Sequence, residues 1–162
     1  MQSSEELSHV NEDGEASMVD VGDKKVTDRR AVAEGRIQMS PATLEKIVEG
    51  DVEKGDVLTV ARLAAIQAAK ETSRLIPLCH PLPLDHVDVE LDYGSEAEKA
   101  WVTIRVQTRV QAKTGVEMEA LVAVSNGLLT IYDMCKAIDR EMQIGPIHLL
   151  EKSGGRTGHW TR

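Results

Sequence analysis

The sequence predicts an α+β fold, a ferredoxin-like antiparallel sheet with helices packed on one face, plus an extra helix. Strand-like and helix-like segments follow one another in the order strand, helices, two strands, helix, strand, which is a βαββαβ pattern. The chain has 162 residues, the size of one domain. Its composition, 41% hydrophobic and 28% charged, is typical of a globular protein that buries a core.

The first half of the chain predicts one strand and two helices. Residues 30–39 alternate between polar and small or apolar side chains, as a strand does. Ser40-Pro41 is a helix start, with serine as N-cap and proline at the first helical position. Asp56 caps a second, alanine-rich helix, which we expect to run from residue 57 to about residue 74.

The second half predicts three strands and the longest helix. Three prolines between residues 76 and 85 exclude a helix there and stiffen that loop. Apolar residues at spacings of three or four then predict a helix before the last strand. The expected elements are strands at 86–93, 101–111 and 143–151, a polar turn at 94–96, and a helix at 116–140.

Both ends of the chain are polar and lack a periodic apolar pattern. We therefore expect a flexible N-terminal arm at 1–18, a single α+β domain at 19–151 and a mobile glycine-rich tail at 152–162.

Composition and charge exclude several functional classes. Nineteen basic and 27 acidic residues give a net charge of −8, which argues against a general nucleic-acid binder but leaves room for a local anion site. Without 18 consecutive apolar residues, we expect no membrane span. Cys79 and Cys135 form no CxxC pair, which favours a reducing cytoplasm.

The first candidate segment is Leu78-Cys79-His80, just before a proline. A held imidazole at His80 can donate to phosphate or act as an acid or base near neutrality. The alternative is a rigid surface turn with a solvated histidine. Cys79 is either a nucleophile or, as is commoner, a buried inert thiol.

The second candidate is the end of the long predicted helix. Asp133 and Lys136 are i,i+3 neighbours and share a face, so they are either a catalytic pair or an ordinary surface ion pair. At the start of the same helix, Gly115 marks a junction whose free N–H groups suit an anion. There, Glu117 and Glu119 serve one site only if the helix begins after them. Otherwise they are acidic residues that stabilise the helix N-terminus through its dipole.

Three further basic residues stand at loop or element starts, Arg29, Lys54 and Lys152. Each one alone is better explained as a solvated charge. His80 and His86 lie six residues apart with no second metal-type pair, so we predict no metal site.

Several blocks of sequence, in order, resemble one known family. LIPLCHPL at 75–82, KTGVEMEAL at 113–121 and LTIYDMCKA at 129–137 are similar to the signatures of the cyclic pyranopterin monophosphate synthase family, which is molybdenum cofactor biosynthesis protein C. The resemblance runs from about residue 17 to residue 158. It departs at Ser125-Asn126-Gly127, where the family has small apolar residues, and Arg156 replaces a lysine.

The resemblance implies a lyase that converts 3′,8-cyclo-7,8-dihydroguanosine 5′-triphosphate to cyclic pyranopterin monophosphate and releases pyrophosphate. It implies catalysis by Asp133, Lys136 and Lys54. It also implies a substrate site that contains Leu78, Cys79, His80, Met118, Glu119, Glu117, Arg29 and Lys152. No cofactor is implied, although a divalent ion can accompany the triphosphate.

The resemblance further implies a homohexamer, a trimer of dimers, with a functional link to the radical enzyme of the preceding step. An Ala- and Val-rich open face of the sheet is the contact surface that we expect. Two other functions compete. One is a catalytically silent purine-nucleotide binding module. The other is a cysteine hydrolase built on Cys79 and His80, which adjacent residues rarely support because they seldom face each other.

Overall fold

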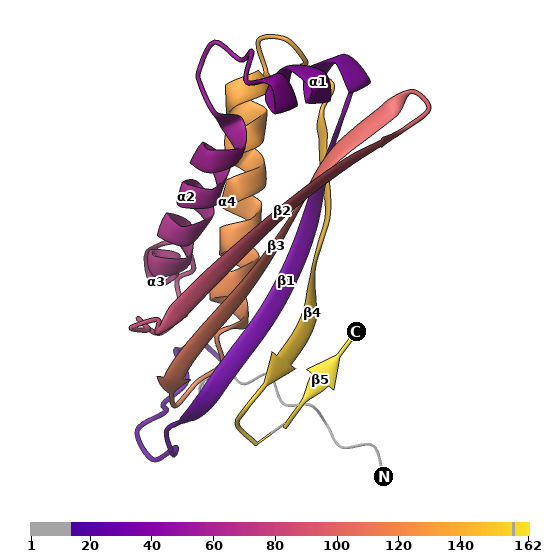
Figure 1. Cartoon of the computed structure of the whole chain (residues 1–162). Helices are drawn as coiled ribbons and strands as arrows, with labels where there is room; N and C mark the ends of the chain where they lie inside the picture. The colour runs from indigo at the N-terminus through magenta and orange to yellow at the C-terminus, as the bar shows by residue number, and fades with distance from the viewer. Residues whose placement is uncertain (1–13, 157) are drawn as a thin grey trace.

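The structure is a computed structural model that describes residues 14–156 and 158–162. Its centre is a five-stranded antiparallel sheet in the order β2-β3-β1-β4-β5. The helices α2 and α4 lie side by side on one face of this sheet (Figure 1). The predicted α+β class is therefore confirmed, and β3 lies between β1 and β2 as a ferredoxin-like sheet requires. Most of the expected N-terminal arm lies outside the described residues.

The central strand β1, Thr27–Met39, pairs with β3 on one side and β4 on the other. Its helix-facing positions carry small side chains at Ala31, Ala33 and Gly35. A Cβ at Gly35 would lie 2.7 Å from Val124 of α4, so only glycine lets the helix come this close. The core has no Phe, and this close approach replaces bulky aromatic packing.

Two capped helices follow β1. In α1, Pro41–Glu49, the Ser40 hydroxyl accepts a hydrogen bond from the Thr43 N–H, as predicted. The Asp56 carboxylate caps α2, Val57–Lys70, in the same way. We expected this second helix to continue to residue 74, but a short separate helix, α3 (Thr72–Leu75), follows it. The Thr72 hydroxyl donates to the carbonyls of α2's last turn, and such side-chain bonds bend or interrupt a helix.

The longest helix, α4, spans Glu117–Cys135, so the prediction that it reaches residue 140 was wrong. The physical reason is tertiary. The Asp139 carboxylate accepts bonds from the Ser40 N–H and the Thr43 hydroxyl, and this draws the chain out of the helix toward α1.

The unusual Asn126-Gly127 pair fits the α2–α4 contact. Asn126 donates to the Ala64 carbonyl at 3.1 Å, and Gly127 leaves room for Ile104 and Ala65.

The remaining strands are β2 (His86–Glu96), β3 (Lys99–Ala112), β4 (Gln143–Ser153) and β5 (Trp160–Thr161). Strand pairing extends past the expected turn at 94–96, and the chain reverses at Ala97, whose φ is +51°. Some residues of the predicted tail belong to strands. Lys152 and Ser153 belong to β4, and β5 pairs with β4 through the tail's last residues. Within the described residues, no helix is long and apolar enough to cross a membrane.

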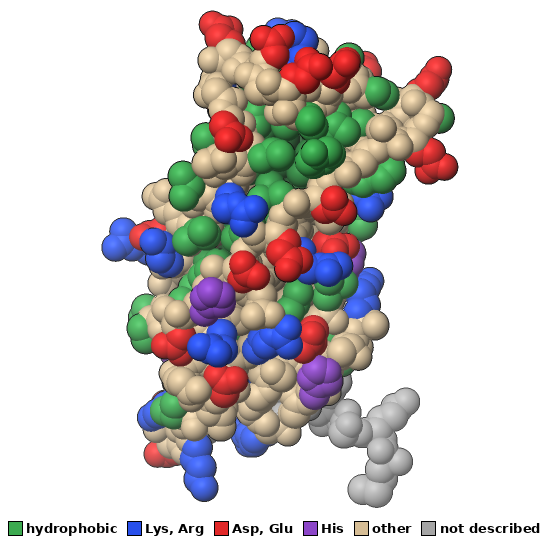
Figure 2. All heavy atoms as spheres, in the orientation of Figure 1, with side chains coloured by type: hydrophobic (Ala, Val, Ile, Leu, Met, Phe, Trp, Pro, Cys, Tyr) green, Lys and Arg blue, Asp and Glu red, His purple; other side chains and the backbone are tan. Residues whose placement is uncertain are grey.

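The open face of the sheet is charged, contrary to the Ala- and Val-rich surface that we expected. Arg30 on β1 forms an ion pair with Glu151 at 2.7 Å, and Arg105 on β3 forms one with Glu34 at 2.7 Å. Figure 2 shows Lys and Arg side chains interleaved with Asp and Glu across the lower half of the molecule, whereas acidic side chains gather over α1. The small side chains of β1 point to the helices instead, because α4 needs that space.

Candidate functional site

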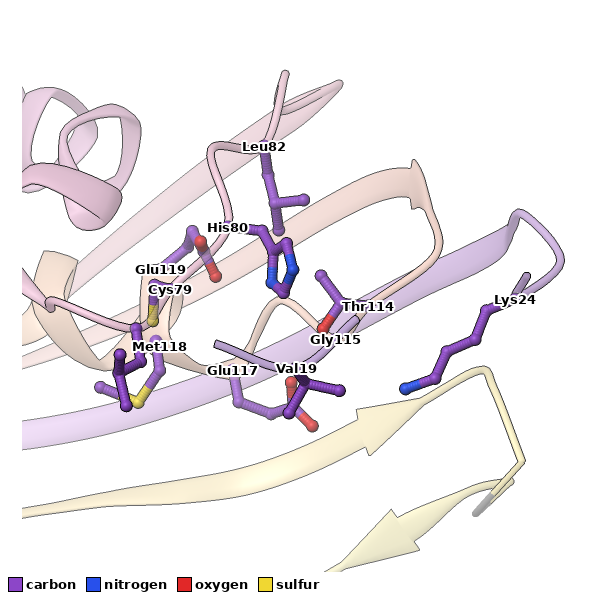
Figure 3. A pocket seen from close by; sticks show the side chains of 11 residues that line it. Val19, Lys24, Cys79, His80, Leu82, Thr114, Gly115, Glu117, Met118 and Glu119 are labelled. Atoms are coloured by element: carbon purple, nitrogen blue, oxygen red, sulfur yellow. The ribbon is translucent and has the colours of Figure 1, made fainter. Parts of the chain in front are cut away.

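A pocket of about 280 Å³ lies where the loop after α3 meets the start of α4 (Figure 3). Three stretches of the chain line it, and they bring together six of the predicted substrate-binding residues. Its lining residues are Val19, Lys24, Leu78, Cys79, His80, Leu82, Thr114, Gly115, Glu117, Met118 and Glu119.

The loop that carries His80 is held by backbone bonds as well as prolines. The Cys79 N–H donates to the Ile76 carbonyl at 3.1 Å, and the Asp85 N–H donates to the Arg109 carbonyl at 3.0 Å. Figure 3 shows His80 near the middle of the pocket, with Cys79 and Glu119 to one side. The half-buried imidazole faces the pocket, so the alternative of a merely solvated turn does not describe it.

The start of α4 forms the floor of the pocket. The buried Thr108 hydroxyl donates to the Val116 carbonyl at 3.0 Å and fixes the residue that precedes the helix. The helix begins without a side-chain cap, so its first N–H groups are available to an anion. A side chain at Gly115 would collide with the carboxylate of Glu117, which folds back over this glycine.

Both Glu117 and Glu119 line this pocket although both are helical, so the condition that we placed on them was wrong. The pocket lies across the end of the helix instead of along one side, and the first turn therefore reaches it from several directions. Lys152 of β4 pairs with Glu117 at 2.8 Å, which places this predicted lysine at the same site.

Burial changes the proton affinity of two pocket groups. Glu119 is only 4% exposed, and burial, with the nearby charge of Glu117, raises its pKa to about 7. Burial and the charge of Glu119 raise the pKa of the Cys79 thiol. A raised pKa leaves less thiolate at neutral pH, which argues against Cys79 as a nucleophile.

Arg29 lies beside the pocket and not in its lining. Its guanidinium donates to the carbonyls of Ala112 at 3.4 Å and Lys113 at 3.2 Å, at the strand end that leads into α4. The side chain therefore holds the junction before the helix, and its charge lies near the pocket without entering it.

The predicted catalytic residues meet at the other end of α4. Lys54 donates to the Asp133 carboxylate and to the Asp133 backbone carbonyl, both at 2.9 Å, and Lys136 donates to the same carboxylate at 2.6 Å. All three side chains are about half exposed. Lys54 also satisfies one of the carbonyls that a helix C-terminus leaves unpaired, so the cluster is built into the helix end.

The two lysines determine the charge of this cluster. Hydrogen bonds from Lys136 and then Lys54 lower the pKa of Asp133 to about 2, and the bond to Asp133 raises the pKa of Lys136. At neutral pH, Asp133 is a carboxylate and Lys136 is a cation, and their mutual hydrogen bond makes Asp133 a weaker base and Lys136 a weaker acid than the free groups.

The two groups of predicted residues are far apart within one chain. Asp133 follows Glu117 by 16 residues in one continuous helix. At a rise of 1.5 Å per residue, this corresponds to about 24 Å along the helix axis. The structure therefore brings the substrate-binding set and the catalytic set together separately, at opposite ends of α4.

Sequence reasoning missed Lys24, Thr114 and Trp160 as neighbours of the site. Lys24 and Val19 arrive from the N-terminal segment, which the Lys113 ammonium holds by donating to the Gly22 carbonyl at 2.6 Å. No periodic pattern marks these residues, and of the three only Thr114 lies in one of the blocks that resemble the family, at 113–121. In the described part of the chain, no group of three or more His, Cys, Asp or Glu side chains is placed to hold a metal ion.

A buried carboxylate in a pocket and a lysine-held carboxylate on the same helix are kinds of groups that acid–base enzymes use. The fold and these groups are compatible with many small-molecule enzymes, and comparison with known sequences identifies the family. Residues 18–155 match the MoaC family, and the chain belongs to that family.

Named relatives match over nearly the whole chain. The cyclic pyranopterin monophosphate synthase of Roseiflexus sp. (strain RS-1) is 57% identical over 155 residues, which cover 94% of this chain and 96% of that protein. The protein of the same name from Brucella ovis is 54% identical over 154 residues, covering 95% of this chain and 92% of its own. Among solved structures, the de novo designed protein Foldit4 gives a TM-score of only 0.35 at 12% identity, over 78% of this chain and 99% of its own.

Proposed function

We propose that this chain is a cyclic pyranopterin monophosphate synthase, a lyase of molybdenum cofactor biosynthesis. Its substrate is 3′,8-cyclo-7,8-dihydroguanosine 5′-triphosphate, and its products are cyclic pyranopterin monophosphate and pyrophosphate. The observation that carries the proposal is the pair of clusters at the two ends of α4. They hold residues of the family's motifs in a pocket at one end and around a carboxylate bound by two lysines at the other. The names of the relatives support the same reaction.

The catalytic cluster supplies the proton transfers. Rebuilding a purine as a pterin moves several protons, which requires acceptors and donors within reach of one ligand. Asp133 is ionised in this cluster, and it becomes a stronger proton acceptor when the substrate's phosphates draw the two lysines that lower its pKa away from it. The charges of Lys136 and Lys54 stabilise the negative charge that develops on the departing pyrophosphate.

The pocket at the start of α4 binds and orients the substrate. His80 donates to the phosphates or to a ring acceptor, and Met118 and Leu78 supply apolar walls. Glu119 keeps a proton at slightly acidic pH because its pKa is about 7, so it can donate to a ring nitrogen or carbonyl. The Glu117–Lys152 pair offers one acceptor and one cation at the rim.

The working unit in this proposal is a homohexamer, a trimer of dimers, in which each active site takes one end of α4 from each of two chains. The separation of about 24 Å between the clusters supports this, because a single nucleotide cannot engage both ends of one long helix. The pocket volume of about 280 Å³ also lies below the range of typical ligand pockets. A second chain would enlarge it.

Several expectations complete the proposal. No resident cofactor is needed, since the rearrangement involves no net oxidation, and a divalent ion can arrive with the substrate's triphosphate. The radical enzyme of the preceding step supplies the substrate. Both cysteines are free thiols, as expected for a cytoplasmic protein.

The direct test is to incubate the protein with the authentic cyclised triphosphate and follow both products. We expect cyclic pyranopterin monophosphate and pyrophosphate in equal amounts. Tight binding without turnover would contradict the proposal and favour a silent nucleotide-binding module.

A further inference from the structure

The short strand β5 brings an aromatic side chain to the helix-covered face of the sheet. Trp160 pairs directly with Lys152 of β4. Directly opposed residues of antiparallel strands project to the same face. Lys152 reaches Glu117 at the start of α4, so Trp160 lies on the same side as that ion pair. The indole is 41% exposed and is one of only four aromatic side chains in the chain.

The turn before β5 is built against a predicted site residue. Gly154 and Gly155 adopt φ values of +98° and +73°, which favour glycine. A side chain at Gly155 would collide with the guanidinium of Arg29, and one at Gly154 would collide with the Asp28 carbonyl. After the turn, the Arg162 N–H donates to the Leu150 carbonyl at 2.9 Å. The position of Trp160 is therefore coupled to the site and is not that of a free tail.

Trp160 also lines a shallow groove with Leu149, Lys152, Glu117 and Met118. Glu117 and Met118 line the His80 pocket as well, so the groove and the pocket share a wall. Lys152 is already paired with Glu117, and the rest of the groove is apolar. Such a surface suits a flat, apolar face with polar edges better than it suits free phosphate.

We propose that Trp160 is a further substrate-positioning residue, whose indole face packs against the planar heterocycle of the nucleotide-derived substrate. This inference rests on the proposed function. An indole offers a large, rigid surface to a flat ring system. Loss of such stacking weakens binding on the order of 10-fold to 100-fold. Because the indole carries no group that transfers a proton in the proposed reaction, its loss affects binding much more than the chemical step.

The chain provides its own spectroscopic control, because Trp101 is the only other tryptophan. Trp101 pairs with Gln38 of β1. Trp160 pairs with Lys152 of β4, which in turn pairs with Ala31 of β1. Ala31 and Gln38 are seven residues apart along β1, which corresponds to about 23 Å. Trp101 packs under the Arg36 guanidinium, 4.9 Å from the ring centre. It should not respond to a ligand near Lys152.

The experiment uses two proteins with one tryptophan each, Trp101→Phe and Trp160→Phe, both carrying Lys136→Ala to block turnover. The probe is the authentic cyclised triphosphate, with inorganic tripolyphosphate as the arm that lacks a ring. Calorimetry in the same samples reports occupancy. We expect the nucleotide to quench Trp160 emission in the Trp101→Phe protein. We expect no change with tripolyphosphate and none from Trp101 in the Trp160→Phe protein.

Activity in the otherwise unchanged protein gives the second readout. Trp160→Ala should raise KM on the order of 10-fold to 100-fold with a nearly unchanged kcat, and Trp160→Phe should restore most of the affinity. Binding heat with unchanged Trp160 emission, or an equal response to tripolyphosphate, would overturn the role of Trp160 and leave the proposed function intact. Emission that depends on protein concentration alone would assign the indole to a subunit contact and also overturn it. Absence of both binding and wild-type turnover would instead overturn the proposed function.

Discussion

The two ends of α4 create opposite environments for a carboxylate. At the N-terminal end, Glu119 is buried among loops from distant parts of the chain, and burial raises its pKa to about 7. At the C-terminal end, Asp133 is half exposed, and two lysines lower its pKa to about 2. One helix thus carries a group that keeps its proton near neutrality and a group that does not. Pairs of titratable groups whose pKa values are pushed apart are a common basis for acid–base catalysis.

The comparison also shows why neither end is a complete site. The N-terminal end has a pocket and few free cations, because Lys152 is already paired with Glu117. The C-terminal end has two cations and an acceptor but lines none of the described pockets. A second copy of the chain that aligned one end against the other would combine the two sets.

The largest expected effect comes from the C-terminal end. Asp133→Asn or Lys136→Ala should lower kcat by on the order of 10²-fold to 10⁴-fold, the range for loss of a proton-transfer group. The melting temperature should stay near the wild-type value, since both side chains are exposed. The matched control is Lys46→Ala, in which α1 loses the exposed ion pair between Lys46 and Asp51, and it should leave turnover unchanged. Wild-type turnover in the folded Lys136→Ala protein would refute the catalytic role of the pair.

At the N-terminal end of α4, Glu119 should make the free energy of unfolding depend on pH. In the folded chain the pKa of Glu119 is about 7, above the ordinary value of 4.5 for a glutamate side chain. The folded state therefore binds more protons between these values, and the free energy of unfolding falls as pH rises through this window. Glu119→Gln should remove up to about 3 kcal/mol of that loss, at 1.36 kcal/mol per pKa unit.

Urea unfolding at pH 5 and pH 8, at one fixed protein concentration, measures this effect. The variant should gain stability relative to wild type at the higher pH and little at the lower pH. Parallel stability curves for the two proteins would show that Glu119 is not held in a desolvated state.

The smallest expected effect is at Cys79, which lies in the same pocket. Because its thiol pKa is raised, little thiolate is present for bond formation, and we assign the side chain to the pocket wall. Cys79→Ser should keep kcat within a few-fold of wild type in a steady-state assay. Loss of all turnover with intact substrate binding would revive the nucleophile hypothesis.

Local patterns in the sequence were enough to predict the helix starts, whereas the members of both clusters followed from the resemblance to the family. Ser40 and Asp56 cap their helices as predicted, and the i,i+3 spacing of Asp133 and Lys136 predicts their contact. The end of α4 was wrong because it depends on Asp139 reaching α1, which is 96 residues away from it along the chain at Thr43. Tertiary contacts of this kind leave no local signal.

The candidate site was predictable as a set of residues but not as an arrangement. The burial of Glu119 depends on the loop at 78–82 folding over the start of α4, and local periodicity carries no information about that contact. The approach of Trp160 depends in the same way on the register of β5 against β4. An isolated two-residue strand gives no sequence pattern, so that part of the chain looked like a mobile tail.

The central claim is that each active site joins the N-terminal end of α4 from one chain to the C-terminal end from another. The most direct test mixes two inactive variants, Lys136→Ala and His80→Ala, under conditions that exchange subunits, with native mass spectrometry to count hybrids. Random mixing makes half of the dimers hybrid, and each hybrid has one intact site of two, so we predict recovery of about one quarter of wild-type activity. Hybrids that form in the expected numbers and remain inactive would contradict the shared site.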